Sequence, residues 1–253
     1  MARFKVGVQL HPQHTSMDAL RAAWRAADEM GVDSIFTWDH FFPLYGDAQG
    51  PHFEAMSLLA AVAVETRHAM IGALVTANSY RNPNLLADMA RTIDHLSNGR
   101  FIIGIGAGWF ERDYKEYGYE FGSAVTRLRA LDQTLPIIKD RLRKLQPPPI
   151  GRVPILVGGG GERVTLRITA RYADMWNTFG PPATYARKCQ VLDDWCGKVG
   201  RDPGEIERTV SIRDDEIDDS EVYLRAGAQH LILEVAAPFS LKGAERLLKA
   251  ARG

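Results

Sequence analysis

FKVGVQLHPQHTSMDALRAAWRAADEMGVDSIFTWDH, residues 4–40, holds the pattern that decides the fold. Residues 4–10 form a short apolar run that predicts a strand. Residues 18–30 place apolar side chains at helical spacing, and Gly31 ends that helix. Residues 34–38 are again a short, β-branched and aromatic run that predicts a second strand. A strand, a helix and a second strand in this order predict a βαβ unit with parallel strands.

The same alternation continues to the end of the chain. Further strands are expected at residues 69–76, 100–105, 153–157, 174–178, 209–212 and 230–235. Helices are expected at residues 54–66, 83–96, 127–145, 162–172 and 182–199. Eight strands alternating with helices over 253 residues predict a single α/β domain, 1–253, folded as a (β/α)8 TIM barrel. An open, doubly wound sheet is the alternative.

The charge balance argues against two classes of partner. Lys plus Arg and Asp plus Glu number 31 each, so no net field attracts nucleic acid or an anionic membrane. No apolar run reaches the ~20 residues needed to cross a bilayer, and the N-terminus runs directly into a strand. Cys189 and Cys196 match neither a redox pair nor a zinc site. We therefore expect a cytoplasmic protein with a small-molecule substrate.

Apolar side chains around Phe36 and the helix at 54–66 fit either the barrel core or a homodimer face. The core is the commoner place for them.

Polar, aromatic and glycine residues follow the predicted strands, where barrel enzymes place their active sites. These strand-end residues are His11, Asp39 and His40, residues 76–79, residues 104–109, residues 158–161 and residues 176–178. Gly158, Gly159, Gly160 and Gly161 lie between a strand and a helix, where backbone N–H groups can bind a phosphate. A tight turn that needs one or two glycines is the alternative.

Other strand ends suggest further roles. Gly104, Gly106 and Gly108 are not a dinucleotide fingerprint, since no helix follows at once, and they fit a flat ring close to the strands. Asp39 and His40 suit proton transfer or orientation of a polar ring, with a helix cap or surface ion pair as the alternative. The spacing of Asp39 with His11, His14 and His52 fits no metal site.

The chain resembles the bacterial luciferase-like superfamily of flavin- and deazaflavin-dependent barrel enzymes, and most of all its coenzyme F420-dependent oxidoreductases. The segments that carry the resemblance are residues 33–40, 80–83, 96–100, 104–111, 158–167, 170–177 and 200–203. Together they span residues 5 to about 206, and their joint occurrence in this order is specific to the superfamily.

The resemblance implies roles for individual residues. Asp39 would bind the polar edge of the deazaflavin, and His40 would lie near the carbon that accepts the hydride. A bulge with a non-prolyl cis bond between Leu74 and Val75 would support the ring, lined by Thr76 and Asn78. Gly106, Ala107 and Gly108, followed by Trp109, would carry the cofactor's side chain, and the glycines at 158–161 would hold its phosphate.

Departures from the family pattern limit what can be transferred. Relatives that oxidise sugar phosphates have a catalytic glutamate where this chain has Trp109, and Glu111 is a substitute only if its loop turns inward. The insertion before the fifth strand is shortened to residues 145–152, and the tail after Ile212 is brief. We expect hydride transfer between F420 and a small organic substrate. An FMN-dependent monooxygenase and a non-catalytic cofactor-binding barrel are the alternatives.

Overall fold

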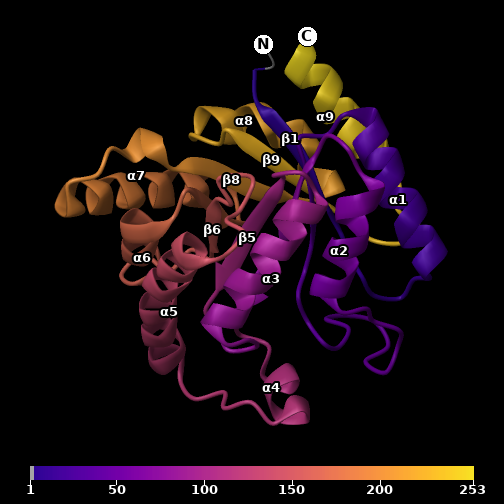
Figure 1. Cartoon of the computed structure of the whole chain (residues 1–253). Coiled ribbons are helices and arrows are strands. Elements are labelled where there is room, and N and C mark those ends of the chain that lie inside the picture. Colours follow the sequence, from indigo (N-terminus) through magenta and orange to yellow (C-terminus); the bar gives the residue numbers. More distant parts are fainter. Residues whose placement is uncertain (1–2) are drawn as a thin grey trace.

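The computed structural model describes residues 3–253, and its centre is a barrel of parallel strands surrounded by helices (Figure 1). The strands are β1 (Lys5–Leu10), β2 (Ser34–Thr37), β3 (Met70–Ala73), β4 (Thr76–Ala77), β5 (Phe101–Gly106), β6 (Ile155–Gly158), β7 (Met175–Thr178), β8 (Glu207–Ile212) and β9 (His230–Val235). β3 and β4 share one position, because both pair with β5, and the pairing of β3 with β5 closes the sheet. The predicted eight-position barrel is confirmed.

Helices follow most of the strands and cover the outside of the barrel (Figure 1). The α-helices are α1 (Met17–Met30), α2 (Ala55–Glu65), α3 (Pro83–Leu96), α4 (Glu111–Tyr117), α5 (Ala124–Lys144), α6 (Thr165–Tyr172), α7 (Pro182–Val199), α8 (Ser220–Arg225) and α9 (Lys242–Arg252). Two 3-10 helices, η1 (Pro203–Glu205) and η2 (Asp214–Asp219), flank β8.

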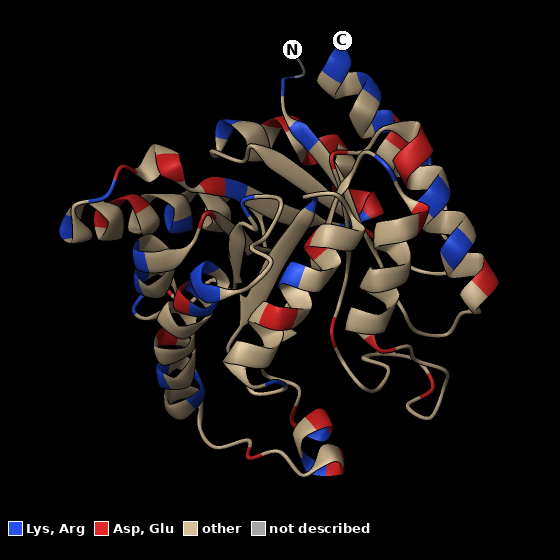
Figure 2. Ribbon diagram, viewed as in Figure 1, with Lys and Arg blue, Asp and Glu red and all other residues tan. Residues whose placement is uncertain are grey.

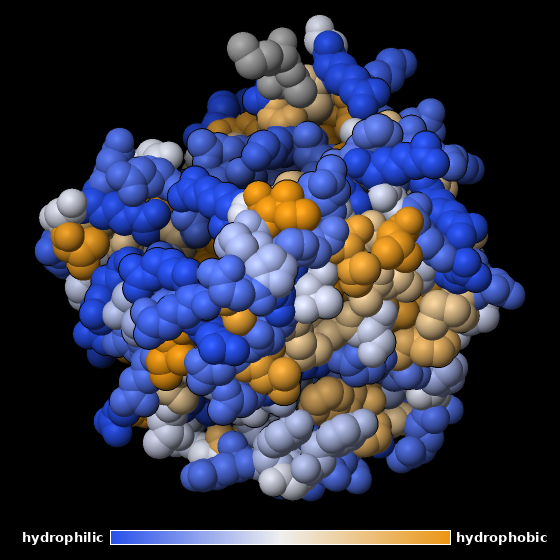
Figure 3. All heavy atoms as spheres, viewed as in Figure 1, coloured by the Kyte–Doolittle hydropathy of each residue, from blue (hydrophilic) through white to orange (hydrophobic). Residues whose placement is uncertain are grey.

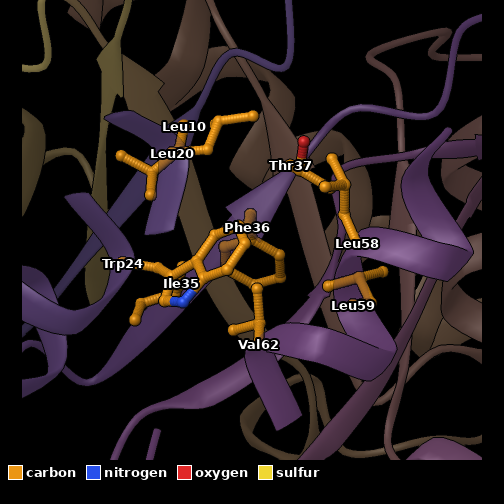
Figure 4. Close-up of a pocket in the computed structure, with 9 residues that line it drawn as sticks. All are labelled: Leu10, Leu20, Trp24, Ile35, Phe36, Thr37, Leu58, Leu59 and Val62. Carbon is orange, nitrogen blue, oxygen red and sulfur yellow. The ribbon is translucent and has the colours of Figure 1, made fainter. Parts of the chain in front are cut away.

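The first βαβ unit shows why the sequence folds this way. The Ser16 hydroxyl caps α1 by accepting from the Ala19 amide, and Gly31 ends the helix with φ of 83°. Side chains of α1 and α2 converge on β1 and β2, as Figure 4 shows. Phe36 is fully buried there, and Leu58 and Leu59 of α2 are buried with it. These apolar side chains therefore belong to the core of the molecule.

The third strand differs from the continuous run predicted at 69–76. It is divided into β3 and β4 by a cis peptide bond between Leu74 and Val75. The bond lies where the family resemblance places it. Short-range sequence patterns do not encode the interruption, because the segment is apolar throughout.

Three helix predictions need correction. α5 starts at Ala124 rather than at 127, because Ser123 forms a capping box with Thr126, and it continues past Pro136. α6 starts at Thr165 rather than at 162, since residues 162–164 form a turn. α4 was not predicted; its seven residues are mostly polar and too short for a clear apolar period.

Charged residues of both signs lie on the outer helices, while the strands carry few (Figure 2). On the face viewed in Figure 3, hydrophobic side chains form small patches separated by hydrophilic ones. In residues 3–253 no helix is long and apolar enough to span a membrane.

Candidate active site

A cavity of about 620 Å³ opens at the carboxyl ends of the strands. Every strand position of the barrel contributes to it. Its lining includes Gln9, His11, Trp38, Asp39, His40, Leu44, Tyr45, Leu74, Val75, Ala77, Gly106, Ala107, Gly108, Trp109, Gly158, Gly159, Thr165, Asn177, Thr178, Phe179, Ser211 and Glu234. The cavity therefore lies at the face of the barrel where the sequence predicts the site.

Asp39 is fully buried at the end of β2 and is held by a single guanidinium. Arg81 donates from Nη1 and Nη2 to the two carboxylate oxygens of Asp39. Nη2 also donates to Glu54 Oε1 (2.5 Å) and Nη1 to Thr76 Oγ1 (3.1 Å). Burial lowers the pKa of Arg81, but Asp39 and Glu54 raise it further, so the net shift is upward. The pair fixes Asp39 in one orientation at the cavity wall.

His40 lines the cavity and is anchored from behind by Asp113 of α4. His40 Nδ1 lies 2.7 Å from Asp113 Oδ2, and the carboxylate has no exposed surface. The Tyr80 hydroxyl donates to the same oxygen (2.5 Å), and the Phe41 amide donates to Oδ1 (3.1 Å). An ionised carboxylate only accepts, so Nδ1 carries a proton and Nε2 is the nitrogen left for another partner.

The Leu74–Val75 bulge projects into the cavity and explains two of the glycines. A Cβ on Gly106 would lie 2.9 Å from Val75 Cγ2, and one on Gly158 would lie 2.7 Å from Val75 Cγ1. The Gln9 side-chain amide donates to the Leu74 carbonyl (2.5 Å) and holds the bulge from β1. These two glycines are therefore needed for packing around Val75. This reason differs from those expected from the sequence, which were the close approach of a ring for Gly106 and phosphate binding for Gly158.

The glycine segment after β6 divides into two parts. Gly158 and Gly159 line the cavity, and Gly159 has φ of 120°, which favours glycine. Gly160 and Gly161 lie beyond the lining residues. A Cβ on Gly160 would collide with Lys188 Nζ, so the ammonium group of α7 lies directly over this backbone. Backbone N–H groups and a lysine beside them form a site of the kind that binds phosphate.

Other predicted residues lie outside the cavity lining. Thr76 is occupied by Arg81, and the side-chain oxygen of Asn78 is buried without a hydrogen-bond partner among the described residues. The Glu111 side chain is half exposed and pairs with Lys115 Nζ at 3.0 Å. Glu111 begins α4 and does not line the cavity, so this geometry does not support a catalytic role for it. Trp109, in contrast, does line the cavity; the residue is 65% exposed and its ring stands edge-on to His40.

A group of rings covers the side of the cavity near β1 and β9. His11 stacks on Trp38 with centroids 4.0 Å apart, and its Nδ1 lies 2.6 Å from the Tyr45 hydroxyl. Burial lowers the pKa of His11 to about 4, so its imidazole is neutral at pH 7. Glu234, at the end of β9, faces the same part of the cavity.

Sequence reasoning missed the partners that hold the site together: Asp113, Arg81, Tyr80, Lys188 and Glu234. Tyr80 and Arg81 follow the third strand within a segment that matches the family, which could have drawn attention to them. Asp113 lies in an unpredicted helix and Lys188 in the middle of a long one. Their positions in the site depend on tertiary packing alone.

The comparisons with known proteins agree with this architecture. The model of the luciferase-like monooxygenase family matches residues 1–249. The chain belongs to this family. Among solved structures, an F420-dependent secondary alcohol dehydrogenase in complex with an F420-acetone adduct superposes with a TM-score of 0.86. That match covers 99% of this chain and 100% of the other at 18% identity, and therefore shows the shared fold.

Two curated relatives are more similar in sequence. An F420-dependent glucose-6-phosphate dehydrogenase of Microbacterium testaceum is 27% identical over 207 residues, 74% of this chain and 61% of the relative. A phthiodiolone/phenolphthiodiolone dimycocerosates ketoreductase of Mycobacterium bovis is 29% identical over 223 residues, 74% of this chain and 58% of the relative. The chain thus spans about three fifths of the length of these relatives.

Proposed function

We propose that this member of the luciferase-like family is an oxidoreductase that uses coenzyme F420 and a small organic substrate. The observation that carries the proposal is the anchored pair at the end of β2: Asp39 held by Arg81, and His40 held by Asp113, side by side on one cavity wall. The names of the similar proteins, F420-dependent dehydrogenases among them, support the same activity.

The residues present fit a deazaflavin. The Leu74–Val75 bulge offers a surface for a flat ring, and Asp39 lies at the same wall to accept a hydrogen bond from a ring N–H. Gly106, Ala107 and Gly108 line the same cavity as the bulge and Gly159. The backbone around Gly160 together with Lys188 would hold a phosphate. When bound, the deazaflavin supplies the acceptor or donor of a hydride.

The protein's own chemistry is to hold the substrate and to move a proton. Oxidation of an alcohol to a ketone releases a hydride from carbon and a proton from oxygen. Asp113 occupies Nδ1 of His40, so Nε2 is available to take the hydroxyl proton, or to return it during ketone reduction. The hydrogen bond to Asp113 fixes the orientation of the His40 ring. The negative charge of this buried carboxylate stabilises the positive charge that the imidazole gains.

Hydride transfer is tested by mixing the purified protein with F420 and a panel of alcohols, and with reduced F420 and a panel of ketones. Deazaflavin absorbance reports the change of redox state. We expect turnover with at least one pair, and loss of turnover in His40→Ala with F420 still bound. Tight F420 binding without hydride exchange on any substrate would instead indicate a non-catalytic binding barrel.

The family's name favours a second candidate, an FMN-dependent monooxygenase, and a Type II Baeyer-Villiger monooxygenase in complex with FMN occurs among the structural neighbours. It would share the barrel and the phosphate site. Oxygen consumption with FMN and a flavin reductase separates the two, since hydride transfer through the deazaflavin consumes no oxygen.

A further inference from the structure

We propose that the part of the cavity near β1 and β9 is the substrate subsite, and that Glu234 makes it select an aromatic or apolar substrate without negative charge. This inference rests on the proposed function, because it assigns the other part of the cavity to the cofactor. It specifies a substrate class that the family fold alone does not determine.

The walls of the subsite are aromatic. Trp38 and His11 are stacked, and the Tyr45 ring stands perpendicular to Trp38 with centroids 6.0 Å apart. Trp109 and Phe179 follow β5 and β7, away from β1 and β9, so their mostly exposed side chains line the cavity outside this subsite. Rings in these edge-on and stacked arrangements favour contact with another aromatic or apolar group.

The polar atoms of the subsite are available to a ligand. His11 is 6% exposed, and its Nε2 is buried with no hydrogen-bond partner in residues 3–253. A buried polar atom without a partner costs free energy, so a ligand hydroxyl or carbonyl that pairs with it is favoured. Because the imidazole is neutral, His11 can bind such a group but offers no positive charge to an anion.

Charge in the cavity comes from carboxylates. No Lys or Arg side chain lines it in the part of the chain that the structure describes. Asp39 is compensated by Arg81, whereas Glu234 has no hydrogen bond or ion pair among the described residues. Arg213, the cation that acts on Glu234, already pairs with Asp215 and Glu216. Burial raises the pKa of Glu234, with a smaller contribution from Glu216.

An anionic substrate therefore meets repulsion at this end. A phosphate or carboxylate group would approach Glu234 without a cation to balance it, and unbalanced charges at close range exclude such ligands. Lys188 cannot balance the charge of such a substrate, because it lies over Gly160. That position is on the side of β6 and β7, which the cofactor's phosphate would occupy. A neutral ketone pairs with His11, and a neutral alcohol can also donate to Glu234, without this penalty.

A matched series of ligands tests the charge preference. Acetophenone, 4-acetylbenzoate and 4-(aminomethyl)acetophenone share one aromatic ketone body and differ in charge. Their dissociation constants are measured by saturation-transfer NMR on the full chain, both with and without F420. We expect acetophenone to bind at least about 10-fold more tightly than the benzoate.

Variants assign the preference to Glu234. In Glu234→Gln the ratio of the two dissociation constants should fall to within about 3-fold, and in Glu234→Lys it should reverse. Glu111→Gln, a half-exposed carboxylate outside the cavity, is the matched control and should leave the ratio unchanged.

Benzoate binding as tight as that of acetophenone, no binding of any ligand in the series, or the same ratio in Glu234→Gln would overturn the proposal. Weaker binding of the amine than of the benzoate would do so as well, because an uncompensated carboxylate should favour the ammonium group over the carboxylate. Failure of F420 to bind would be a separate result, against the proposed function, since the series is also measured without the cofactor.

Discussion

Replacing Asp113 by asparagine is expected to disable His40 while leaving the barrel folded. The carboxylate accepts from three donors, His40 Nδ1, the Tyr80 hydroxyl and the Phe41 amide. An asparagine whose oxygen stays on the Phe41 amide turns its NH₂ group towards His40 and Tyr80. Nδ1 must then become an acceptor, which moves the proton to Nε2. In that tautomer Nε2 cannot take a proton from a substrate.

The magnitude follows from the burial of the group. Loss of one or two hydrogen bonds at a fully buried carboxylate costs about 1–3 kcal/mol of stability, or roughly 2–12 °C in Tm for a chain of this size. Loss of a general acid–base group lowers kcat by about 10²–10⁴-fold. The F420 dissociation constant should change by less than about 2-fold, because Asp113 does not line the cavity.

The direct assay is NMR of protein labelled with ¹⁵N at histidine. The wild type should show a downfield Nδ1 proton for His40, and Asp113→Asn should lose it. Two controls accompany the variant. Tyr80→Phe removes a different donor and should keep the resonance, and Glu111→Gln should change neither the spectrum nor kcat. An unchanged His40 resonance in Asp113→Asn, or equal loss of kcat in Tyr80→Phe, would refute the reasoning.

Three further changes have defined outcomes. Arg81→Met leaves the buried Asp39 unpaired and should lower the free energy of unfolding by about 3–5 kcal/mol in a denaturant titration. The control Arg143→Met, on the exposed face of α5, should lower it by under about 0.5 kcal/mol. Equal losses in the two variants would show that Asp39 finds another partner. The pKa of His11 is about 4 in the fold, because burial lowers it from its ordinary value of 6.5, so the unfolded chain binds more protons between these values. Stability should therefore fall by up to about 3 kcal/mol as pH drops from 6.5 to 4, and His11→Gln should remove that part of the slope; a variant with the wild-type slope would contradict this. Gly104→Ala places a methyl group against the Ala73 carbonyl and should lower the free energy of unfolding by about 1–3 kcal/mol. Gly197→Ala, with no neighbour within 4 Å, should instead raise it by about 0.5–1 kcal/mol by stabilising α7. Thermal melts that reverse this order would refute the packing argument.

The barrel was predictable because its elements are encoded locally. Apolar runs of strand length, helical spacing and stop residues such as Gly31 repeat along the chain, and each needs only its neighbours in sequence to be recognised. The departures have physical causes. The start of α5 depends on the capping box between Ser123 and Thr126, and α4 is too short to show a period.

The site was predictable where its residues follow strands. His11, Asp39, His40 and Glu234 all lie at strand ends, although Glu234 was not singled out. Residues that hold the site from outside the cavity lining could not be found in the same way. Asp113 and Lys188 reach the site from helices, and only the packing of those helices brings them beside His40 and Gly160. The reason for Gly106 and Gly158 was likewise hidden, since the Val75 side chain that they accommodate is distant in sequence.

The central claim is that the cavity binds a deazaflavin, and the most direct test is a side-by-side fluorescence titration of the purified protein with F420 and FMN. The account predicts tight F420 binding and weak FMN binding, with F420 affinity reduced in Asp39→Ala and in Lys188→Ala. Preference for FMN would contradict the deazaflavin assignment and favour the monooxygenase alternative. Binding of neither cofactor would contradict the enzyme function itself.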